Sequence, residues 1–400
     1  MKRATDCVLA CLVFGSIAAG AAQAQAQTTT DPNPAMNTPE KVSWQLFTVI
    51  NKAAAGSNVT FETWASNEDT FQGSGVFPGT NGPPNCGPPG ITLRVPPNIL
   101  ATATRQPVTP LASPKILNVP ALSELAPREP GLQPHIIPGG SEEVRRNQAA
   151  FDFIVCNKLN TKSGLRLAFA AGTPISFPTD AVEVKANWVP AGNRSPDQFH
   201  INSDSTGARF ALVSFHLISK AVPNWTWATF EHESNPGRCD FIGCHDDFGA
   251  IVKDVPPHPT PGGTYSACVK TPALKKLLSD AGLPPMWEHY CLKGSQVDFV
   301  TATGLPIHLG NSVTEDGFVN TSSCMTCHSR AAINAQAQPT SGGGFLNPAP
   351  PALCPTGSPC SPNGTPVPSW FFNNPGQPNQ SLLGLQTDFV WSIPFRVTAP

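Results

Sequence analysis

Apolar and polar positions alternate most clearly in the middle of the chain. The stretch AVEVKANWV (181–189) has an apolar side chain at every second position, which is the period of a strand with one buried face. The stretches ARFALVSFHLIS (208–219) and NWTWATFEH (224–232) predict two more strands, joined by a short turn with a proline. The stretch GSQVDFVTATGLPIHLGN (294–311) predicts a hairpin that turns at Gly304. This part of the chain is therefore expected to form a β-rich core.

Helical patterns are fewer and shorter. SWQLFTVINKAA (43–54) predicts a first short helix, with its apolar residues partly on one side. SEEVRRNQAAFDFIVCNKL (141–159) predicts the longest helix, with Ser141 as the N-cap and two glutamates in the first turn. TPALKKLLSDAG (271–282) predicts a compact helix, with Thr271 as the cap, a proline in the first turn and a glycine at the end.

Composition changes this picture by adding loops. Proline and glycine together are abundant (45 and 33 residues), and charged residues make up only 13% of the chain. The Pro/Gly-rich stretches at about 73–140 and 339–380 are predicted to be surface excursions without regular structure. We therefore predict a single α+β domain over residues 27–400, rich in loop and β-structure, with a few short helices. The net charge of −2 disfavours nucleic acid as a partner.

The N-terminus has the pattern of an export signal. Two basic residues are followed by an apolar run (7–22) and by the small residues of AQAQA, so residues 1–26 are predicted to be a cleaved signal peptide. No later stretch predicts a membrane span, and the mature protein is expected to be periplasmic. Of the twelve cysteines, Cys7 and Cys11 fall within the signal. The ten that remain are expected to form disulfides or to hold a covalent cofactor.

The stretch SSCMTCHSRA (322–331) contains the pattern C-x-x-C-H and predicts a short helix that begins near Cys324. Two thiols at this spacing can reach the two vinyl groups of haem, and a histidine directly after the second thiol can bind the iron. Cys324 and Cys327 are thus candidates for covalent attachment of one haem c, with His328 as the proximal ligand. A zinc site is the first alternative, but it would need two further ligands. The second is a pair of disulfide cysteines beside an unrelated histidine.

Through Cys324, Cys327 and His328, together with the signal peptide, the chain resembles c-type cytochromes. This resemblance implies electron transfer in the periplasm between redox partner proteins. The mature chain is also loosely similar to uncharacterised bacterial cytochrome c family proteins that combine VEVKANW, WTWATFEH, SSCMTCHSRA and DFVWSIPFR. In the common small cytochrome c fold a distal methionine follows the motif. Here no methionine or histidine follows His328, so that fold is not expected and the haem-binding segment lies near the C-terminal third.

A sixth iron ligand would therefore come from upstream of the motif. His232 is the first candidate, because Trp225, Trp227 and Phe230 just before it could supply the apolar walls of a haem pocket. His216 and His308 are further candidates. An iron with an open distal side is the alternative to all three.

A second motif leaves a further choice open. Cys239, Cys244 and His245 form C-x-x-x-x-C-H, a longer spacing through which some multihaem cytochromes attach haem. A Cys239–Cys244 disulfide explains the same cysteines without a cofactor.

The preferred interpretation is a periplasmic c-type cytochrome that carries one haem and transfers single electrons. Whether the protein is also an enzyme stays open: a chain this long with an open iron could be a haem-dependent oxidoreductase. A dihaem cytochrome that uses Cys239, Cys244 and His245 is a variant of the preferred interpretation. The alternative of another class is a disulfide-stabilised exported binding protein without haem.

Overall fold

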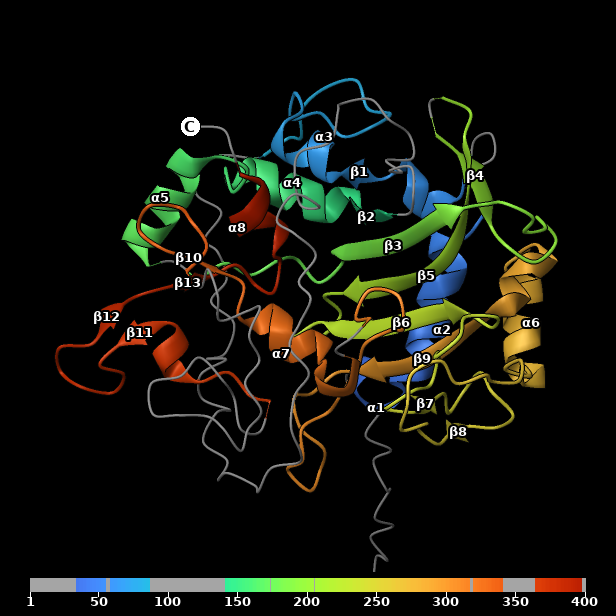
Figure 1. Ribbon diagram of the computed structural model, residues 1–400. Coiled ribbons are helices and arrows are strands. Elements are labelled where there is room, and N and C mark those ends of the chain that lie inside the picture. Colours follow the sequence, from blue (N-terminus) through green and yellow to red (C-terminus); the bar gives the residue numbers. More distant parts are fainter. Residues whose placement is uncertain are drawn as a thin grey trace, which may run out of the picture. The chain divides into compact units, whose positions relative to one another are not determined.

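The computed structural model describes residues 34–54, 58–86, 141–172, 174–204, 206–316, 319–340 and 364–397 (Figure 1). The predicted signal peptide at 1–26 lies outside these residues. So does most of the two Pro/Gly-rich stretches, together with Cys354 and Cys360. Residues 33–400 belong to one compact unit.

A seven-stranded sheet organises this unit. The strand order is β1-β2-β3-β5-β6-β9, with β4 paired to β5, and every neighbouring pair is antiparallel (Figure 1). The strands of the sheet are β1 (Ala65–Ser66), β2 (Ser141–Arg146), β3 (Val182–Pro190), β4 (Ile201–Ser203), β5 (Arg209–Ser219), β6 (Thr226–His232) and β9 (Tyr290–Gln296). Three small two-stranded ladders pair β7 (Cys244–His245) with β8 (Asp254–Val255), β10 (Ala332–Ile333) with β13 (Leu385–Gln386), and β11 (Phe372–Asn373) with β12 (Ser381–Leu382).

The helices are short. They are α1 (Pro34–Asn37), α2 (Pro39–Ile50), α3 (Asn67–Phe71), α4 (Gln148–Cys156), α5 (Lys162–Ala171), α6 (Pro272–Asp280), α7 (Cys324–Ser329) and α8 (Ser392–Arg396). Single turns of 3-10 helix lie at Thr60–Thr63, Pro285–His289, Val319–Thr321 and Pro368–Trp370. None of these described helices has the length and apolar character needed to cross a membrane.

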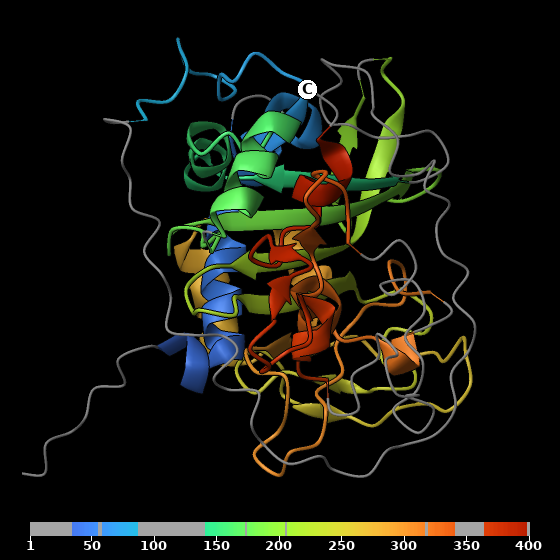
Figure 2. The same cartoon turned by 90° about the vertical axis from the view of Figure 1, so that its left-hand side faces the viewer.

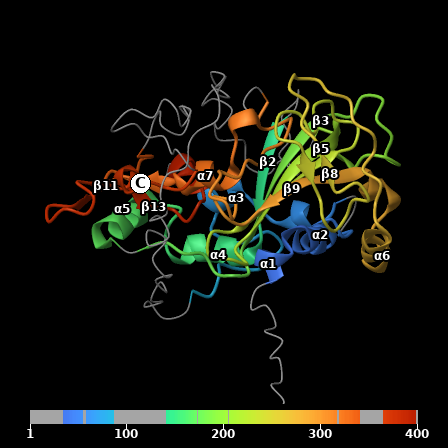
Figure 3. The same ribbon diagram turned by 90° about the horizontal axis from the view of Figure 1, so that it is seen from below.

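One face of the sheet is apolar and carries one of two large hydrophobic cores; the other lies among α4, α5, α7 and α8 and includes Ile218 and Trp227. Side chains of β3, β5 and β6 on the apolar face pack against α2. Helices α2 and α6 lie on the same side of the sheet (Figures 2 and 3). Phe47 of α2 is fully buried between aromatic rings of the sheet and of the loop before β9. This apolar face is formed by Val184, Ala186, Phe215, Leu217, Ala228 and Phe230.

The opposite face of the sheet is buried but largely polar. Because cross-strand partners share a face, the strand registers place two rows of side chains there. We call this surface the polar face; its rows are Glu183, Ile218, Trp227 and Gln296, and Lys185, His216, Thr229 and Gly294. Asn311 and Ser323, from the chain that follows β9, bond Thr229 and Gln296 of these rows. At Gly294 the covering chain comes so close that a Cβ would lie 3.2 Å from Leu309 Cδ1.

Several predicted elements are confirmed. The α+β class is correct, and the strands expected at 181–189, 208–219 and 224–232 are β3, β5 and β6. The helix expected at 271–282 is α6, and Thr271 caps it by accepting a hydrogen bond from Leu274 N. The prediction of a half-buried strand at 181–189 is corrected in one respect: the polar residues Glu183 and Asn187 are also buried.

The predicted long helix at 141–159 is wrong in its first part. Ser141–Arg146 is strand β2, and the helix begins only at Gln148, after the capping residue Asn147. The guanidinium of Arg146 is buried and bonds Glu183 of the neighbouring strand, an interaction that a helical first turn could not provide. The predicted hairpin at 294–311 is also shorter than expected. Its first strand is the end of β9, and a single bridge joins Val300 to Pro306.

Three disulfides cross-link the described residues. Cys86 pairs with Cys156 at the end of α4, Cys239 with Cys244, and Cys268 with Cys291. Cross-links of this kind stabilise a fold mainly by restricting the unfolded chain, which suits a protein with so much loop.

Replacing Phe47 by alanine should remove a central support of the apolar face. Large-to-small substitutions of buried phenylalanines cost about 3–5 kcal/mol of unfolding free energy. The matched control is Val49→Ala on the same helix, whose side chain is 57% exposed and whose loss should cost less than about 0.5 kcal/mol. Denaturant unfolding of both variants measures the difference, and equal costs would show that α2 does not pack as described.

Candidate functional site

The C-x-x-C-H pattern lies on the short helix α7, which begins at Cys324 as predicted but ends at Ser329. Ser323 is the N-cap, and its hydroxyl accepts a hydrogen bond from Thr326 N. Cys324 and Cys327 are half-buried free thiols, whereas the six other described cysteines are all paired. Burial raises the pKa of both thiols, so they are protonated at neutral pH.

Gln296, at the end of β9, fixes the start of this helix to the sheet. Its Nε2 donates to Ser323 Oγ over 3.0 Å, and its Oε1 accepts from Met325 N over 3.2 Å. The side chain of Gln296 is 1% exposed, and it sits next to Trp227 in the first row of the polar face. One amide side chain therefore satisfies two polar groups of the first turn of α7.

The C-terminal segment 386–391 holds the other end of α7. Carbonyl groups in the last turn of a helix have no partner within the helix and need one from outside. The Trp391 indole donates to Cys327 O over 3.2 Å, and Gln386 Nε2 donates to Ser329 O over 2.9 Å. The motif helix is thus fixed at both ends by side chains distant from it in sequence.

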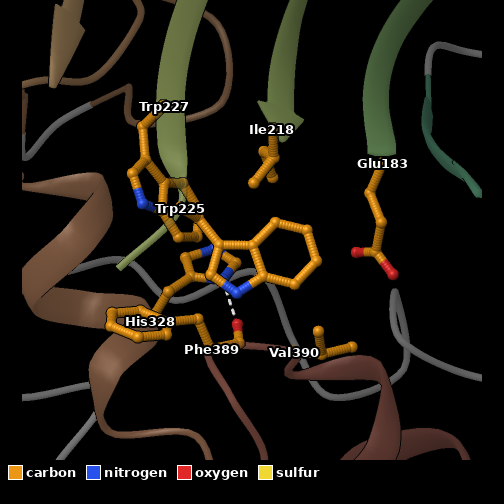
Figure 4. Close-up of a pocket in the computed structure, with 7 residues that line it drawn as sticks. All are labelled: Glu183, Ile218, Trp225, Trp227, His328, Phe389 and Val390. Carbon is orange, nitrogen blue, oxygen red and sulfur yellow. Dashed lines mark hydrogen bonds between the residues drawn. The ribbon is translucent and has the colours of Figure 1, made fainter. Parts of the chain in front are cut away.

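His328 is held as a neutral imidazole with a defined tautomer. Its Nδ1 lies 2.8 Å from the carbonyl oxygen of Phe389, which can only accept, so Nδ1 carries the proton (Figure 4). This leaves Nε2 deprotonated, which is the state that can bind a metal. Burial lowers the pKa of His328 to about 4, and its ring packs against Trp227 with 4.6 Å between the centroids.

A very small pocket, with about 10 Å³ of space, lies beside His328 (Figure 4). Most of its walls are apolar, and its one carboxylate, Glu183, accepts from Arg146 Nε over 3.1 Å. The pocket is on the scale of a single water molecule and does not enclose a porphyrin. It is lined by Glu183, Ile218, Trp225, Trp227, His328, Phe389 and Val390.

Two buried donors close to the motif have no acceptor among the described residues. Arg330 directly follows α7 and is 7% exposed, yet its Nη2 makes no hydrogen bond there. Its guanidinium lies 4.4 Å from the ring centroid of Trp370, whose indole Nε1 is also buried without a partner. Burial lowers the pKa of Arg330 to about 10, which still leaves it charged at neutral pH. A buried cation without a counter-ion is costly, so this pair is suited to an anionic group.

The structure does not bring His232, the first candidate for a sixth ligand, to the motif. Its ring stacks on Phe199 with 3.6 Å between the centroids and packs edge-on against Tyr290, its cross-strand partner on β9. Both ring nitrogens are engaged, Nδ1 with Ser234 Oγ and Nε2 with Gln198 O. The aromatic residues just before it do not furnish one common site, because Trp227 faces His328 and Phe230 faces the opposite core.

His216 lies on the polar face, one row away from Trp227. Its side chain is buried, with 6% exposure. Its Nε2 lies 3.3 Å from both Glu315 Oε1 and Asn311 Nδ2. Its Nδ1 has no hydrogen-bond partner among the described residues. His308 is exposed, and its Nδ1 lies 3.3 Å from Ser322 O, just before α7. Of the three candidates, His216 and His308 therefore lie on the same side of the sheet as the motif.

The residues of the second motif are placed apart from the first. Cys239 and Cys244 are bonded to each other, which is the disulfide alternative stated above. His245 is exposed and pairs with Asp254 over 2.7 Å. The structure thus leaves no free thiols at Cys239 and Cys244 for a second covalent haem.

Comparison with known proteins adds no further guide to function: no family model, no curated protein and no solved structure matches this chain.

Three contributors to the site were not identified from the sequence. Gln296 lies in a stretch that was assigned only to a hairpin, and Arg330 is an ordinary charged residue in sequence terms. The contribution of Phe389 is a backbone carbonyl, which no residue pattern reveals. The segment GLQTDFVWSIPFRV (384–397) did carry a signal, because its aromatic and apolar residues exceed what an exposed C-terminal tail would need.

Replacing Gln296 by leucine should loosen the start of α7. The change keeps the side-chain volume but leaves the buried Met325 N without its partner, which costs about 1–3 kcal/mol, and removes one of the hydrogen bonds of Ser323 Oγ. The exposed Gln336 provides the control, since Gln336→Leu should change the unfolding free energy by less than about 0.5 kcal/mol. If both variants unfold at the same denaturant concentration as the parent, Gln296 does not anchor the helix.

Acid should destabilise the fold through His232. Burial lowers the pKa of His232 to about 4 from its ordinary 6.5, so between these values the unfolded chain binds a proton that the folded chain does not. The contribution of neutral His232 to the unfolding free energy is fully present above pH 6.5, and it falls by about 3 kcal/mol as the pH drops to 4. His232→Gln should flatten the pH dependence of the unfolding free energy in this window, whereas substitution of the exposed His258 should leave the slope intact. An unchanged slope in His232→Gln would contradict this origin.

Proposed function

We propose that this protein is a c-type cytochrome that carries one haem on Cys324 and Cys327, with His328 as the axial ligand of the iron, and that it transfers single electrons between redox partner proteins. One observation carries the proposal. The two thiols stay free in a protein whose other described cysteines are paired, and the adjacent imidazole is fixed in its metal-binding tautomer. The export signal expected at residues 1–26 agrees with a periplasmic location.

The two simpler interpretations of the motif are less well supported. A disulfide pair would bond Cys324 to Cys327, but both are free. A zinc site would need further ligands close to them. Among the described residues, the single group of His, Cys, Asp and Glu side chains close enough to hold a metal is Glu233 with Cys268 and Cys291, and those two cysteines form a disulfide.

The surroundings of the motif suit a haem in two further respects. Trp225, Trp227 and Phe389 give the imidazole an apolar environment, and low polarity around a haem is one determinant of its potential. Arg330 and Trp370 offer two unsatisfied donors, which fit an anionic group such as the carboxylates of the macrocycle.

A bound haem would supply the ferrous and ferric states between which an electron is stored and released. The protein chain would hold the haem and orient its iron ligand. Cys324 and Cys327 would each hold the haem through one thioether bond, formed by addition of the thiol S–H across a vinyl group without a leaving group. His328 keeps its proton on Nδ1 through the Phe389 carbonyl and offers Nε2 to the iron. Gln296 and Trp391 fix the helix on which all three residues lie.

A haem-dependent oxidoreductase is the second candidate, and the state of His232, the first upstream candidate, favours it. Both ring nitrogens of His232 are engaged, whereas His216 and His308 each have one nitrogen without a bond among the described residues. If neither His216 nor His308 binds the iron, the iron keeps an open position. His216 and Glu315, 3.3 Å apart, are of the residue types that move protons in such enzymes.

The number of haems on the full chain tests the preferred function. Expression with the cytochrome c maturation machinery should give one covalent haem per mature chain, seen in the intact mass and in a pyridine haemochrome spectrum. A Cys324→Ala/Cys327→Ala variant should carry none. The control Cys239→Ala/Cys244→Ala should still carry one, whereas a count that falls from two to one in this control would establish the dihaem protein.

Carbon monoxide separates the electron carrier from the oxidoreductase. The reduced carrier should bind carbon monoxide only slowly if His216 occupies the sixth position, and His216→Ala should then bind it at least tenfold faster. Fast binding by the parent protein, unchanged in His216→Ala, would favour an open iron. Absence of covalent haem from the parent chain would refute both candidates.

A further inference from the structure

The carbonyl group that holds His328 belongs to an unusual turn. Asp388 and Phe389 both have positive φ, of 50° and 71°, although neither is glycine. Each such residue costs about 1–3 kcal/mol and persists only where the surrounding structure imposes it. Something must therefore hold this turn in the conformation that directs Phe389 O toward His328.

The structure provides that support in a buried ion pair. Lys220 Nζ lies 2.6 Å from Asp388 Oδ1, and both residues are 3% exposed. The second carboxylate oxygen accepts from Phe177 N over 2.7 Å, and the ammonium also donates to Pro223 O over 2.7 Å. Each charge thus has a second, backbone partner, which is the condition under which a buried pair holds a fixed geometry.

Lys220 connects this turn to the sheet. It directly follows β5, and its ammonium lies 5.5 Å from the ring centroid of Trp225, which lines the pocket beside His328. Asp388 directly precedes Phe389, so a shift of its carboxylate would rotate the peptide whose oxygen faces His328. The path from β5 to the imidazole passes through one ion pair and the backbone of Asp388 and Phe389.

We propose that Lys220 and Asp388 are positioning residues that maintain the hydrogen bond from His328 Nδ1 to Phe389 O, and that they thereby lower the reduction potential of the haem. The second half of this statement rests on the proposed function. A histidine that donates from Nδ1 to a carbonyl becomes a more basic ligand. A more basic ligand stabilises the ferric state, so loss of the hydrogen bond should raise the potential.

The tautomer of His328 tests the first half without any haem. The variant Lys220→Met/Asp388→Asn removes both charges together, and asparagine tolerates positive φ and still offers an oxygen to Phe177 N. In the full chain expressed without maturation machinery, nitrogen-15 shifts of the imidazole report which nitrogen carries the proton. We expect the Nδ1–H form to dominate in the parent, and its ratio to the Nε2–H form to fall at least tenfold in the variant.

The control is a buried ion pair on the opposite face of the sheet, Glu143 with Arg145 on β2. Glu143→Gln/Arg145→Met should perturb stability without changing the tautomer ratio of His328. If Lys220→Met/Asp388→Asn does not fold, as judged by near-ultraviolet circular dichroism, Asp388→Asn alone is measured in the same way. An unchanged tautomer ratio in a folded variant overturns the proposed positioning role of Lys220 and Asp388.

The potential of the haem-loaded protein tests the second half. A tenfold change in the equilibrium constant for reduction corresponds to 59 mV for one electron. The reduction potential of the Lys220→Met/Asp388→Asn variant should be higher than that of the parent by an amount of this order. A changed tautomer ratio with an unchanged potential would overturn the link to redox tuning. A chain without haem would refute the proposed function and leave the tautomer result standing, so the two failures are distinguishable.

Discussion

Polar groups that are buried in a protein must find hydrogen-bond partners, and this constraint organises the whole structure. The sheet buries both of its faces, but only one is apolar. The other presents carboxylates, amides, a lysine and a histidine that no hydrophobic helix could cover. The chain covers them with the loop 311–315 and with the start of α7. Thr314 Oγ1 donates to Asn187 Oδ1 over 2.8 Å, and Ser312 N donates to Glu231 over 3.0 Å.

The candidate site follows from this division of the sheet. The apolar face packs against α2 and forms one of the two large cores of the unit, so the polar face is available to hold the residues of the candidate site. Gln296 is part of a row of the sheet and also part of the anchor of α7. The C-terminal segment then bonds polar groups that the sheet does not reach. It donates hydrogen bonds to carbonyl groups of α7 and accepts one from the Nδ1–H of His328. Residues 220, 296, 328 and 389 are far apart in sequence and form one connected set of contacts.

The sequence predicted what depends on local pattern. Period-two alternation located β3, β5 and β6, and Thr271 with its following proline located α6. The spacing of Cys324, Cys327 and His328 predicts a haem site, and that remains a prediction; the structure shows that the two thiols are free. Errors arose where tertiary contacts override local preference. Glu142 and Glu143 look like the first turn of a helix, yet Arg146 bonds Glu183 of the neighbouring strand β3. Arg145 bonds Glu143 two residues before it, a spacing that places both side chains on one face of a strand. His232 was chosen for its aromatic neighbours, but alternation along β6 sends Trp227 and Phe230 to opposite faces.

The most direct measurement is the mass of the proteolytic fragment that contains residues 322–331, released from the mature protein after export. This fragment should carry the mass of one haem, bound through Cys324 and Cys327, and fragmentation should show an unmodified His328. A fragment with two free thiols, or with a disulfide between these cysteines, would contradict the central claim.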